Sequence, residues 1–421
     1  MNAEDFMTAE MTVLSRFLEG KPNRDLETTQ LVSCELLRSV GMDSINCGIN
    51  TLQNDSLALP VAEVQYALSA WFEINKREMP WRITRNPYHI WLSEIILQQT
   101  RVEQGIPYFM RLTTRFPTVE SLSDADLDEV LQLWEGLGYY SRARNLHKAA
   151  KMIVEKWSGL IPSALDDLLS IPGVGPYTAA AISSIAFGHP HAVLDGNVIR
   201  VLSRIFAFPE DVALSSSKQT LHKMASALLD VRRPGDHNES MMELGALVCT
   251  PKPDCPICPV RSFCKGFETG TPTQFPVKRA KKKTPHYHIA VGVIRDEEGR
   301  IFIQKRSLDS MLGGLWEFPG GKNESTESYQ QTCRREILEE TGMSVDVGPL
   351  IASIPHAYSH FKITLHAYDC ELTSSTIPST ALSWEWAVNE QLQEYAFPKA
   401  NRLLINMLTQ QESGTTEGNN D

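Results

Sequence analysis

Apolar residues recur at helical spacing through residues 61–270, and short segments that contain Pro or Gly interrupt them. Four such breaks are FPTVESL, GLIPSAL, IPGVG and GHPHAV. Because Pro and Gly end helices, the pattern predicts one short helix after another. We therefore expect an all-α domain in this part of the chain.

A different pattern begins after residues 271–286, which are rich in Pro, Thr and Lys and have no apolar period, as expected of a linker. HIAVGVIRDEEGRIFIQKR predicts a hairpin of two apolar strands around a turn at Glu298 and Gly299. Further strand-like runs and an acidic helix predict an α+β domain over residues 287–408. The polar residues 409–421 predict a disordered tail.

Residues 1–60 show loosely helical spacing, as in FMTAEMTVLSRFLEG, but contain no motif. We interpret them as a partly helical extension of unknown role. The chain of 421 residues is long enough for two or three domains with cores of their own. We therefore expect a multidomain protein with an all-α domain followed by an α+β domain.

Composition places few limits on function. The chain is 42% apolar and 22% charged, which is ordinary for a globular protein, and no apolar run approaches the roughly 20 residues of a membrane helix. The N-terminus lacks a signal pattern, so we expect a cytoplasmic protein without a membrane partner. The net charge of −11 is unusual for a nucleic-acid binder, but residues 1–60 and 371–421 each carry −5. DNA binding through a local surface is therefore not excluded.

The segment IPGVGPYTAAAISSIAFG, residues 171–188, places two glycines directly before a predicted helix. Gly173 and Gly175 allow a tight turn, and the amides of the following helix N-terminus suit a DNA phosphate. An ordinary connection between two helices would look the same.

Two carboxylates are candidates for catalysis. Glu94 lies in IWLSEIILQQT among apolar residues, where burial would raise its pKa and make it a general acid near neutral pH. The alternative is a Glu on the polar face of an amphipathic helix. Asp195 ends an apolar run in VLDGNVIRVLSRIF, and its alternative role is that of a helix N-cap.

Four cysteines follow the spacing C-x5-C-x2-C-x5-C: Cys249, Cys255, Cys258 and Cys264. They are half of the eight cysteines of the chain, and in a reducing compartment such clustering indicates metal binding rather than disulfides. Zinc and a [4Fe–4S] cluster both suit four closely spaced thiolates.

Taken together, PWR (80–82), WLSEIILQQT, LWEGLGYYSRARNLHKAA, IPGVGPYTAAAI, LDGNVIRVL and ELGALVC resemble the MutY family of adenine DNA glycosylases. The resemblance covers residues 61–270. It implies a monomeric helix-hairpin-helix glycosylase with a [4Fe–4S] cluster on the four cysteines. Such an enzyme flips out and removes adenine mispaired with 8-oxoguanine or guanine in duplex DNA.

The family pattern also assigns roles to individual residues. Glu94 would protonate adenine N7, and Asp195 would stabilise the oxocarbenium-like sugar cation. The remaining assignments are Tyr177 and Asn197 beside Asp195, Arg82 and Glu243 at the adenine, and Gln99 and Tyr139 as wedges in the base stack.

Tyr177 separates two reaction types. Bifunctional relatives carry a Lys directly after the hairpin, where its amine attacks C1′, and Tyr cannot form that Schiff base. We therefore expect base removal without efficient strand cleavage. The first cysteine interval is five residues where the family has six, and we expect the cluster to form because all four ligands remain.

The C-terminal part resembles the Nudix family, since WEFPGGKNESTESYQQTCRREILEETGM matches the Nudix box at every fixed position. Glu336, Glu339 and Glu340 would share one helix face and are candidate Mg²⁺ ligands. One interpretation is an active enzyme that hydrolyses oxidised nucleoside triphosphates. We favour the other, in which the box is an inherited helix of a domain that reads the lesion.

In MutY relatives a Phe-Ser-His loop contacts 8-oxoguanine, and this chain has Tyr358, Ser359 and His360 there. A Ser hydroxyl can both donate and accept, which suits telling 8-oxoguanine, with a protonated N7, from guanine. A strand-edge loop without a ligand is the alternative. A non-catalytic iron–sulfur DNA-binding module is a third hypothesis for the whole chain, and the presence of both Glu94 and Asp195 argues against it.

Overall fold

The computed structural model describes residues 59–279, 284–324, 326–358, 360–373 and 378–416. Nearly all of the predicted N-terminal extension, residues 1–60, lies outside the described residues, and so does Ser359.

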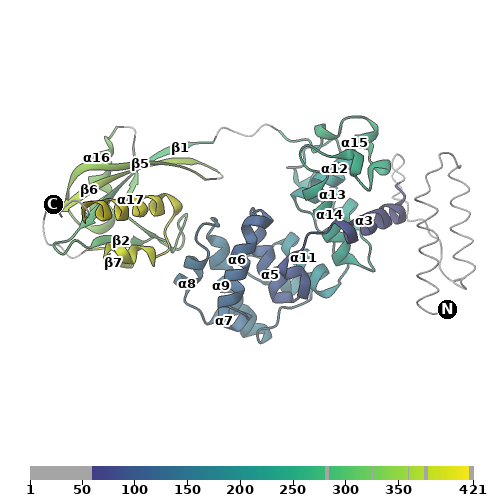
Figure 1. Ribbon diagram of the computed structural model, residues 1–421, viewed down its shortest axis with the longest axis horizontal. Coiled ribbons are helices and arrows are strands. Elements are labelled where there is room, and N and C mark those ends of the chain that lie inside the picture. Colours follow the sequence, from purple (N-terminus) through teal and green to yellow (C-terminus); the bar gives the residue numbers. More distant parts are fainter. Residues whose placement is uncertain (1–58, 280–283, 325, 359, 374–377, 417–421) are drawn as a thin grey trace, which may run out of the picture. The chain divides into compact units, whose positions relative to one another are not determined.

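Helices joined by short turns occupy residues 61–268, which confirms the predicted succession of helices (Figure 1). They are α3 (Val61–Asn75), α4 (Pro80–Thr84), α5 (Pro87–Leu97), α6 (Val102–Arg115), α7 (Val119–Ser123), α8 (Leu127–Leu133), α9 (Ser141–Trp157), α10 (Leu165–Ser170), α11 (Pro176–Phe187), α12 (Gly196–Ile205), α13 (Ser215–Leu228), α14 (Pro234–Leu247) and α15 (Lys265–Glu268). Short 3₁₀ turns at Cys255–Ile257, Arg261–Phe263 and Pro272–Gln274 complete this part.

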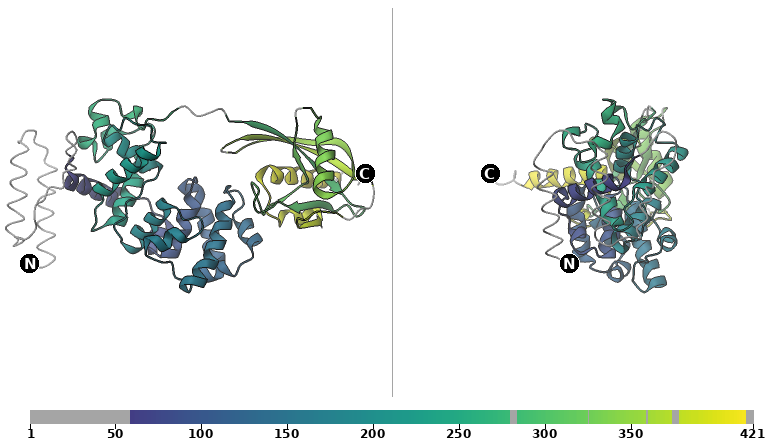
Figure 2. Two further views of the ribbon diagram at one scale, coloured as in Figure 1. Left: turned by 180° about the vertical axis from the view of Figure 1, so that it is seen from behind. Right: turned by 90° about the vertical axis from the view of Figure 1, so that its right-hand side faces the viewer.

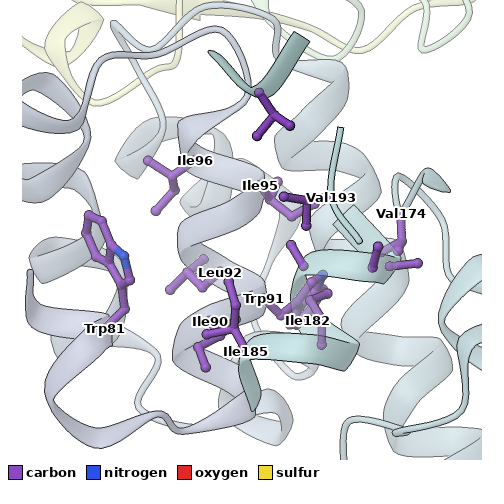
Figure 3. Packing of buried hydrophobic residues seen from close by; sticks show 14 of the residues in the cluster. Trp81, Ile90, Trp91, Leu92, Ile95, Ile96, Val174, Ile182, Ile185 and Val193 are labelled. Carbon is purple, nitrogen blue, oxygen red and sulfur yellow. The ribbon is translucent and has the colours of Figure 1, made fainter. Parts of the chain in front are cut away.

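Helix α5 is the central helix of this part. Asn86 caps its N-terminus by accepting hydrogen bonds from the amides of Tyr88 and His89, and Pro87 occupies the first helical position. Seven consecutive residues from Ile90 to Ile96 are buried. Figure 3 shows apolar side chains of α5 reaching to several sides of the helix, with Ile182 among the neighbouring apolar residues. A helix that is apolar on all sides belongs in a core, so α5 has no polar face on which Glu94 could lie.

The second part of the chain is a seven-stranded mixed sheet with helices. Its strands are β1 (His286–Arg295), β2 (Ile301–Lys305), β3 (Trp316–Glu317), β4 (Gly320–Lys322), β5 (Val345–Ala357), β6 (Lys362–Leu372) and β7 (Trp384–Ala387). Strands β1 and β2 form the predicted hairpin, with Arg295 opposite Ile301. Strand β1 is also parallel to β6, and the order along the sheet is β3-β2-β1-β6-β5.

Two helices cover opposite faces of this sheet, as the alternation along β1 requires. Val291 and Val293 pack in one apolar cluster with residues of α17 (Lys399–Thr416). Ala290 and Ile294 point the other way and pack with residues of α16 (Tyr329–Thr341). Figure 2 shows the sheet from behind, with α16 and α17 separated by the strands. The predicted α+β architecture is therefore confirmed.

The predicted tail at residues 409–421 differs from the structure, because α17 continues to Thr416. Apolar residues Leu404, Ile405 and Leu408 anchor this helix in the core, and a helix held by tertiary packing can extend past its last apolar residue. None of the helices in the described part of the chain is long and apolar enough to cross a membrane.

Candidate active site

A cavity of about 700 Å³ in the helical part brings together most of the residues that the sequence singled out. Its lining includes Arg82, Glu94, Gln99, Gly173, Gly175, Tyr177, Asp195, Asn197 and Glu243. These residues come from α4, α5, the turn before α11, α12 and α14, so the cavity exists only once these helices pack together. Of the predicted glycosylase residues, Tyr139 is not part of this lining.

Glu94 reaches the cavity from the buried helix α5 and is 8% exposed. The pKa of its carboxyl is raised to about 7, mainly by burial and to a smaller extent by the nearby charges of Asp195 and Glu239. A hydrogen bond with Tyr177 acts in the opposite direction. A carboxyl group with this pKa is protonated in a large share of molecules at neutral pH and can donate a proton.

Asp195 is the N-cap of α12, as the alternative interpretation of this residue predicted. Its Oδ1 accepts a hydrogen bond from the amide of Val198 at 2.7 Å, and its Oδ2 accepts one from Asn197 Nδ2 at 2.9 Å. Burial raises the pKa of Asp195, whereas these hydrogen bonds lower it. The cap also holds the carboxylate at the cavity wall, so capping and a catalytic role are compatible.

Tyr177 lies in the first turn of α11, directly after the Gly173–Gly175 turn. Its hydroxyl donates to Met242 Sδ at 3.3 Å. Burial and the neighbouring charges of Glu94 and Asp195 hold its pKa well above the usual value, so the phenol stays neutral. The first turn after the hairpin therefore presents a neutral phenol to the two carboxylates, and no amine.

Another wall of the cavity is a network of charged side chains. Glu243, on α14, is 1% exposed, and its two oxygens accept from Arg82 Nη1 at 3.0 Å and Arg77 Nε at 2.9 Å. Arg82 Nε also donates to Glu239 Oε1 at 2.6 Å. Glu239 Oε2 has no hydrogen-bond partner among the described residues, although Arg85 Nη2 lies 3.6 Å away. The network thus offers both charged donors and an unused acceptor.

Gln99 and Tyr139 lie in two separate loops, one after α5 and one before α9. Both have positive φ angles, 60° for Gln99 and 48° for Tyr139, although neither is a glycine. Non-glycine residues in this region cost about 1–2 kcal/mol, so the surrounding structure must hold them there.

The four predicted cluster ligands also come together. Cys249, Cys255, Cys258 and Cys264 line one small cavity with the 3₁₀ turns of the cysteine loop. Arg204 is 2% exposed and donates from Nη1 to Cys249 Sγ at 3.2 Å. A charged donor thus contacts the sulfur of one predicted ligand. Four cysteine side chains around one cavity match the number of ligands that a [4Fe–4S] cluster requires.

A hydrogen-bonded chain connects the two sites. Arg200 Nε donates to the carbonyl oxygen of Cys249 at 2.7 Å, and its Nη2 donates to Asn197 Oδ1 at 2.8 Å. Asn197 in turn donates to Asp195. The cysteine loop and the carboxylate of Asp195 are therefore only two side chains apart.

In the sheet part, the three carboxylates of the Nudix box do not converge on one point. Arg335 Nη1 donates to Glu336 at 2.8 Å and to Glu339 at 3.1 Å, and the same guanidinium pairs with Glu327. Glu340 turns elsewhere and accepts from Gln304 Nε2 at 2.8 Å and the amide of Gly320 at 3.1 Å. An arginine therefore balances the charges for which the sequence suggested Mg²⁺, and the structure does not support that metal site.

The loop between β5 and β6 carries the predicted lesion-reading residues. Tyr358 stacks on Phe361 with ring centroids 4.7 Å apart, and His356 meets its edge at 4.6 Å. His360 is exposed. Tyr358 therefore belongs to an aromatic cluster with His356 and Phe361.

Several residues of the site escaped the sequence argument. Glu239 could have been found, because it lies one helical turn before Glu243 on the same face of α14. Arg77 and Arg204 have no such signal, since an arginine is ordinarily a solvent-exposed residue. Their contacts depend on segments far away in the sequence.

Comparison with known proteins identifies the family. Residues 92–228 match the HhH-GPD superfamily of base excision DNA repair proteins, and residues 290–407 match the NUDIX domain. An adenine DNA glycosylase of Rattus norvegicus is 33% identical over 407 residues, which cover 83% of this chain and 79% of that protein. The chain belongs to the adenine DNA glycosylase family. Its human relative, from Homo sapiens, is 34% identical over 424 residues, or 85% of this chain and 77% of that protein.

Among solved structures, that of a thermostable thymine-DNA glycosylase is 27% identical, with a TM-score of 0.46, and covers 50% of this chain and 97% of that chain. Family membership confirms the predicted resemblance and the fold class. The chain is a DNA glycosylase, with a helix-hairpin-helix domain followed by a Nudix-like domain.

Proposed function

We propose that this glycosylase removes adenine mispaired with 8-oxoguanine or guanine in duplex DNA, and that it does so without an efficient lyase step. The observation that carries the proposal is Glu94, a buried carboxyl group with a pKa of about 7 at the wall of a cavity that also holds Asp195. A cavity of about 700 Å³ is within the range of small-molecule pockets and has room for a flipped base.

In the proposed reaction Glu94 donates its proton to N7 of the flipped adenine. The bond between C1′ and N9 then breaks, and its electron pair goes to the base, which leaves as neutral adenine. Asp195, held by the amide of Val198 and by Asn197, stabilises the positive charge that develops on the sugar. A water molecule attacks C1′ and loses a proton, and the product is an abasic site.

The charged wall of the cavity would select adenine. Its 6-amino group is a donor, and Glu239 Oε2 is a buried acceptor that makes no hydrogen bond among the described residues, with Arg85 Nη2 3.6 Å away. The guanidinium of Arg82 supplies donors for a ring nitrogen, and Glu243 fixes its orientation. A base without an exocyclic amino group would leave the acceptor unpaired.

Tyr177 supports the monofunctional part of the proposal. Strand cleavage by this class of enzyme needs an amine that attacks C1′, and the side chain beside the two carboxylates is a neutral phenol. Hydrolysis by water is then the route that remains.

We also propose that the four cysteines hold a [4Fe–4S] cluster. When bound, the cluster cross-links the cysteine loop and adds negative charge beside Arg204. The loop begins directly after α14, the helix that carries Glu239 and Glu243, so an ordered loop also supports the adenine pocket.

Recognition of 8-oxoguanine is proposed for the loop of Tyr358, Ser359 and His360. The stacking of Tyr358 on Phe361 supports this role, because it places an aromatic pair at the predicted lesion-reading segment, and aromatic rings can stack on a base. Replacing Ser359 and His360 together by Ala should narrow the preference for 8-oxoguanine over guanine while adenine release opposite guanine persists.

One assay tests the proposed function. Single-turnover release of adenine is measured from duplexes with 8-oxoguanine, guanine or thymine opposite the adenine, and borohydride is added to trap any Schiff base. We expect release opposite 8-oxoguanine and guanine, weaker release opposite thymine and no trapped complex. Absence of adenine release, or equal release from all three duplexes, contradicts the proposal, and a trapped complex contradicts its monofunctional part.

A further inference from the structure

Arg142 is a buried residue that no catalytic step above uses. It lies in the first turn of α9 and is 8% exposed. A cation in the first turn of a helix faces the positive end of the helix dipole, and burial adds a desolvation cost. Burial alone lowers the pKa of Arg142 to about 10. An arginine held in such an unfavourable place requires compensating contacts.

Those contacts are six oxygen atoms, five of them backbone carbonyls. Nη1 donates to Ile95 O at 3.0 Å, Ile96 O at 2.8 Å, Gln98 O at 2.6 Å and Thr100 Oγ1 at 3.4 Å. Nη2 donates to Leu137 O at 3.1 Å and Gly138 O at 3.3 Å. The first group belongs to the end of α5 and the loop after it, and the second belongs to the loop before α9. The planar guanidinium therefore joins two loops that are about forty residues apart in sequence.

Two of the carbonyls that accept from Arg142 directly precede the residues with positive φ angles. The carbonyl of Gln98 is part of the peptide bond that precedes Gln99, and the carbonyl of Gly138 is part of the one that precedes Tyr139. Fixing a peptide plane constrains the φ rotation of the next residue, and both next residues have left-handed φ angles. The guanidinium also lies 5.7 Å from the centroid of the Tyr139 ring, within cation–π range.

We propose that Arg142 is the positioning residue that presents Gln99 and Tyr139 to the DNA base stack. The proposal rests on the proposed function, in which these two side chains are the wedges that accompany base flipping. A strained backbone persists only where its surroundings hold it, and Arg142 holds both strained residues with one rigid group. The two wedges are therefore set in register with each other before DNA binds.

The test variant is Arg142→Lys, which keeps the charge but replaces a planar five-donor fork with a single nitrogen that cannot span both loops. The matched control is Tyr88→Phe. Tyr88 is a buried residue of α5, the helix whose last carbonyls Arg142 contacts, and its hydroxyl donates to Phe116 O at 2.8 Å. The control thus removes a buried hydrogen bond from α5 without touching the loops.

Two quantities are measured on a duplex with adenine opposite 8-oxoguanine. One is the single-turnover rate of adenine release. The other is the fluorescence of 2-aminopurine placed beside the target adenine, which rises when the stack opens. We expect Arg142→Lys to lower both, the rate at least tenfold, because small misplacements of positioning groups cost up to about 10²-fold. Its affinity for undamaged duplex should change less than about threefold. Tyr88→Phe should lower the melting temperature and leave both quantities unchanged.

A double-mutant cycle shows whether Arg142 acts through the wedges. In a chain that already carries Gln99→Ala and Tyr139→Ala, adding Arg142→Lys should change the release rate less than about threefold. A full tenfold loss in that background, or wild-type release and fluorescence for Arg142→Lys alone, overturns the proposal.

If Arg142→Lys does not fold, Gly138→Ala takes its place. Gly138 has φ of 69° and open space around its missing side chain, so the substitution strains only the backbone that Arg142 holds. Release and fluorescence at the wild-type level in Gly138→Ala then overturn the proposal, and a loss of both supports it. Failure of the proposed function itself is distinct, because the unaltered chain would then release no adenine from the same duplex.

Discussion

The pKa of Glu94 leads to a quantitative prediction for the pH dependence of adenine release. Burial raises this pKa from 4.5 to about 7. At pH 7.5, roughly a quarter of the molecules then hold the proton, compared with roughly one in a thousand at the unshifted pKa. The buried site therefore supplies on the order of 200 times more acid at this pH.

The release rate should consequently be nearly constant below pH 6.5 and fall about tenfold for each pH unit above pH 7.5, because only the protonated form of Glu94 donates. On the acidic side the rate should fall where Asp195 becomes protonated, and its pKa is also raised by burial. The assay is single-turnover release from one duplex across pH 5–9. The enzyme is in excess over the DNA and saturates it at every pH.

Glu94→Gln keeps the size of the side chain and removes the proton donor. Release should fall by roughly 10²–10⁴-fold and lose its dependence on pH above 7. The thermal stability of this variant, in contrast, should not fall below that of the wild type at high pH. A raised carboxyl pKa means that the folded state binds the proton more tightly than the unfolded chain does, so ionisation costs stability as the pH rises from about 4.5 through about 7. The neutral Gln avoids this cost, and the variant should unfold at an equal or higher temperature at pH 8.

The stability measurement distinguishes lost chemistry from lost structure. A Gln variant that releases adenine within tenfold of the wild-type rate would show that Glu94 is not the acid. A wild-type rate that stays constant between pH 6 and 9 would show that its pKa does not control the reaction.

Three further predictions follow from the structure. Tyr177→Lys should give a covalent protein–DNA complex that borohydride traps, because the substitution places an amine beside Asp195. A variant that still removes adenine but gives no trapped complex would mean that residue 177 does not reach C1′. Arg204→Met should lower the iron content of anaerobically purified protein and speed the loss of the cluster in air. The reason is that a charged hydrogen bond, here to Cys249 Sγ, is worth about 1.5–3 kcal/mol. Stoichiometric zinc in the unaltered protein would refute the cluster. Glu339→Gln with Glu340→Gln should leave adenine release within about threefold of the wild type, since the proposed reaction uses neither carboxylate and each already pairs with a side chain, Arg335 or Gln304. Abolished release in a folded variant would contradict this.

Much of this protein follows from local sequence. The Pro and Gly breaks ended the helices where the pattern predicted, because Pro lacks an amide donor and Gly readily adopts non-helical conformations. Asp195 capped α12 and the alternation along β1 separated two cores, since capping and strand periodicity are properties of a few adjacent residues. The cysteine spacing likewise marked the four side chains that line one cavity within a short loop.

Other features were decided only by tertiary structure. Whether Glu94 was a buried acid or a surface residue depended on which helices surround α5, and the local sequence suited both. Three glutamates on one helix face indicated Mg²⁺, but Arg335 balanced two of them and the fold turned Glu340 towards Gln304. Burial, ion pairing and pKa depend on groups that meet through space, because electrostatic energy is set by distance and dielectric environment and not by separation along the chain.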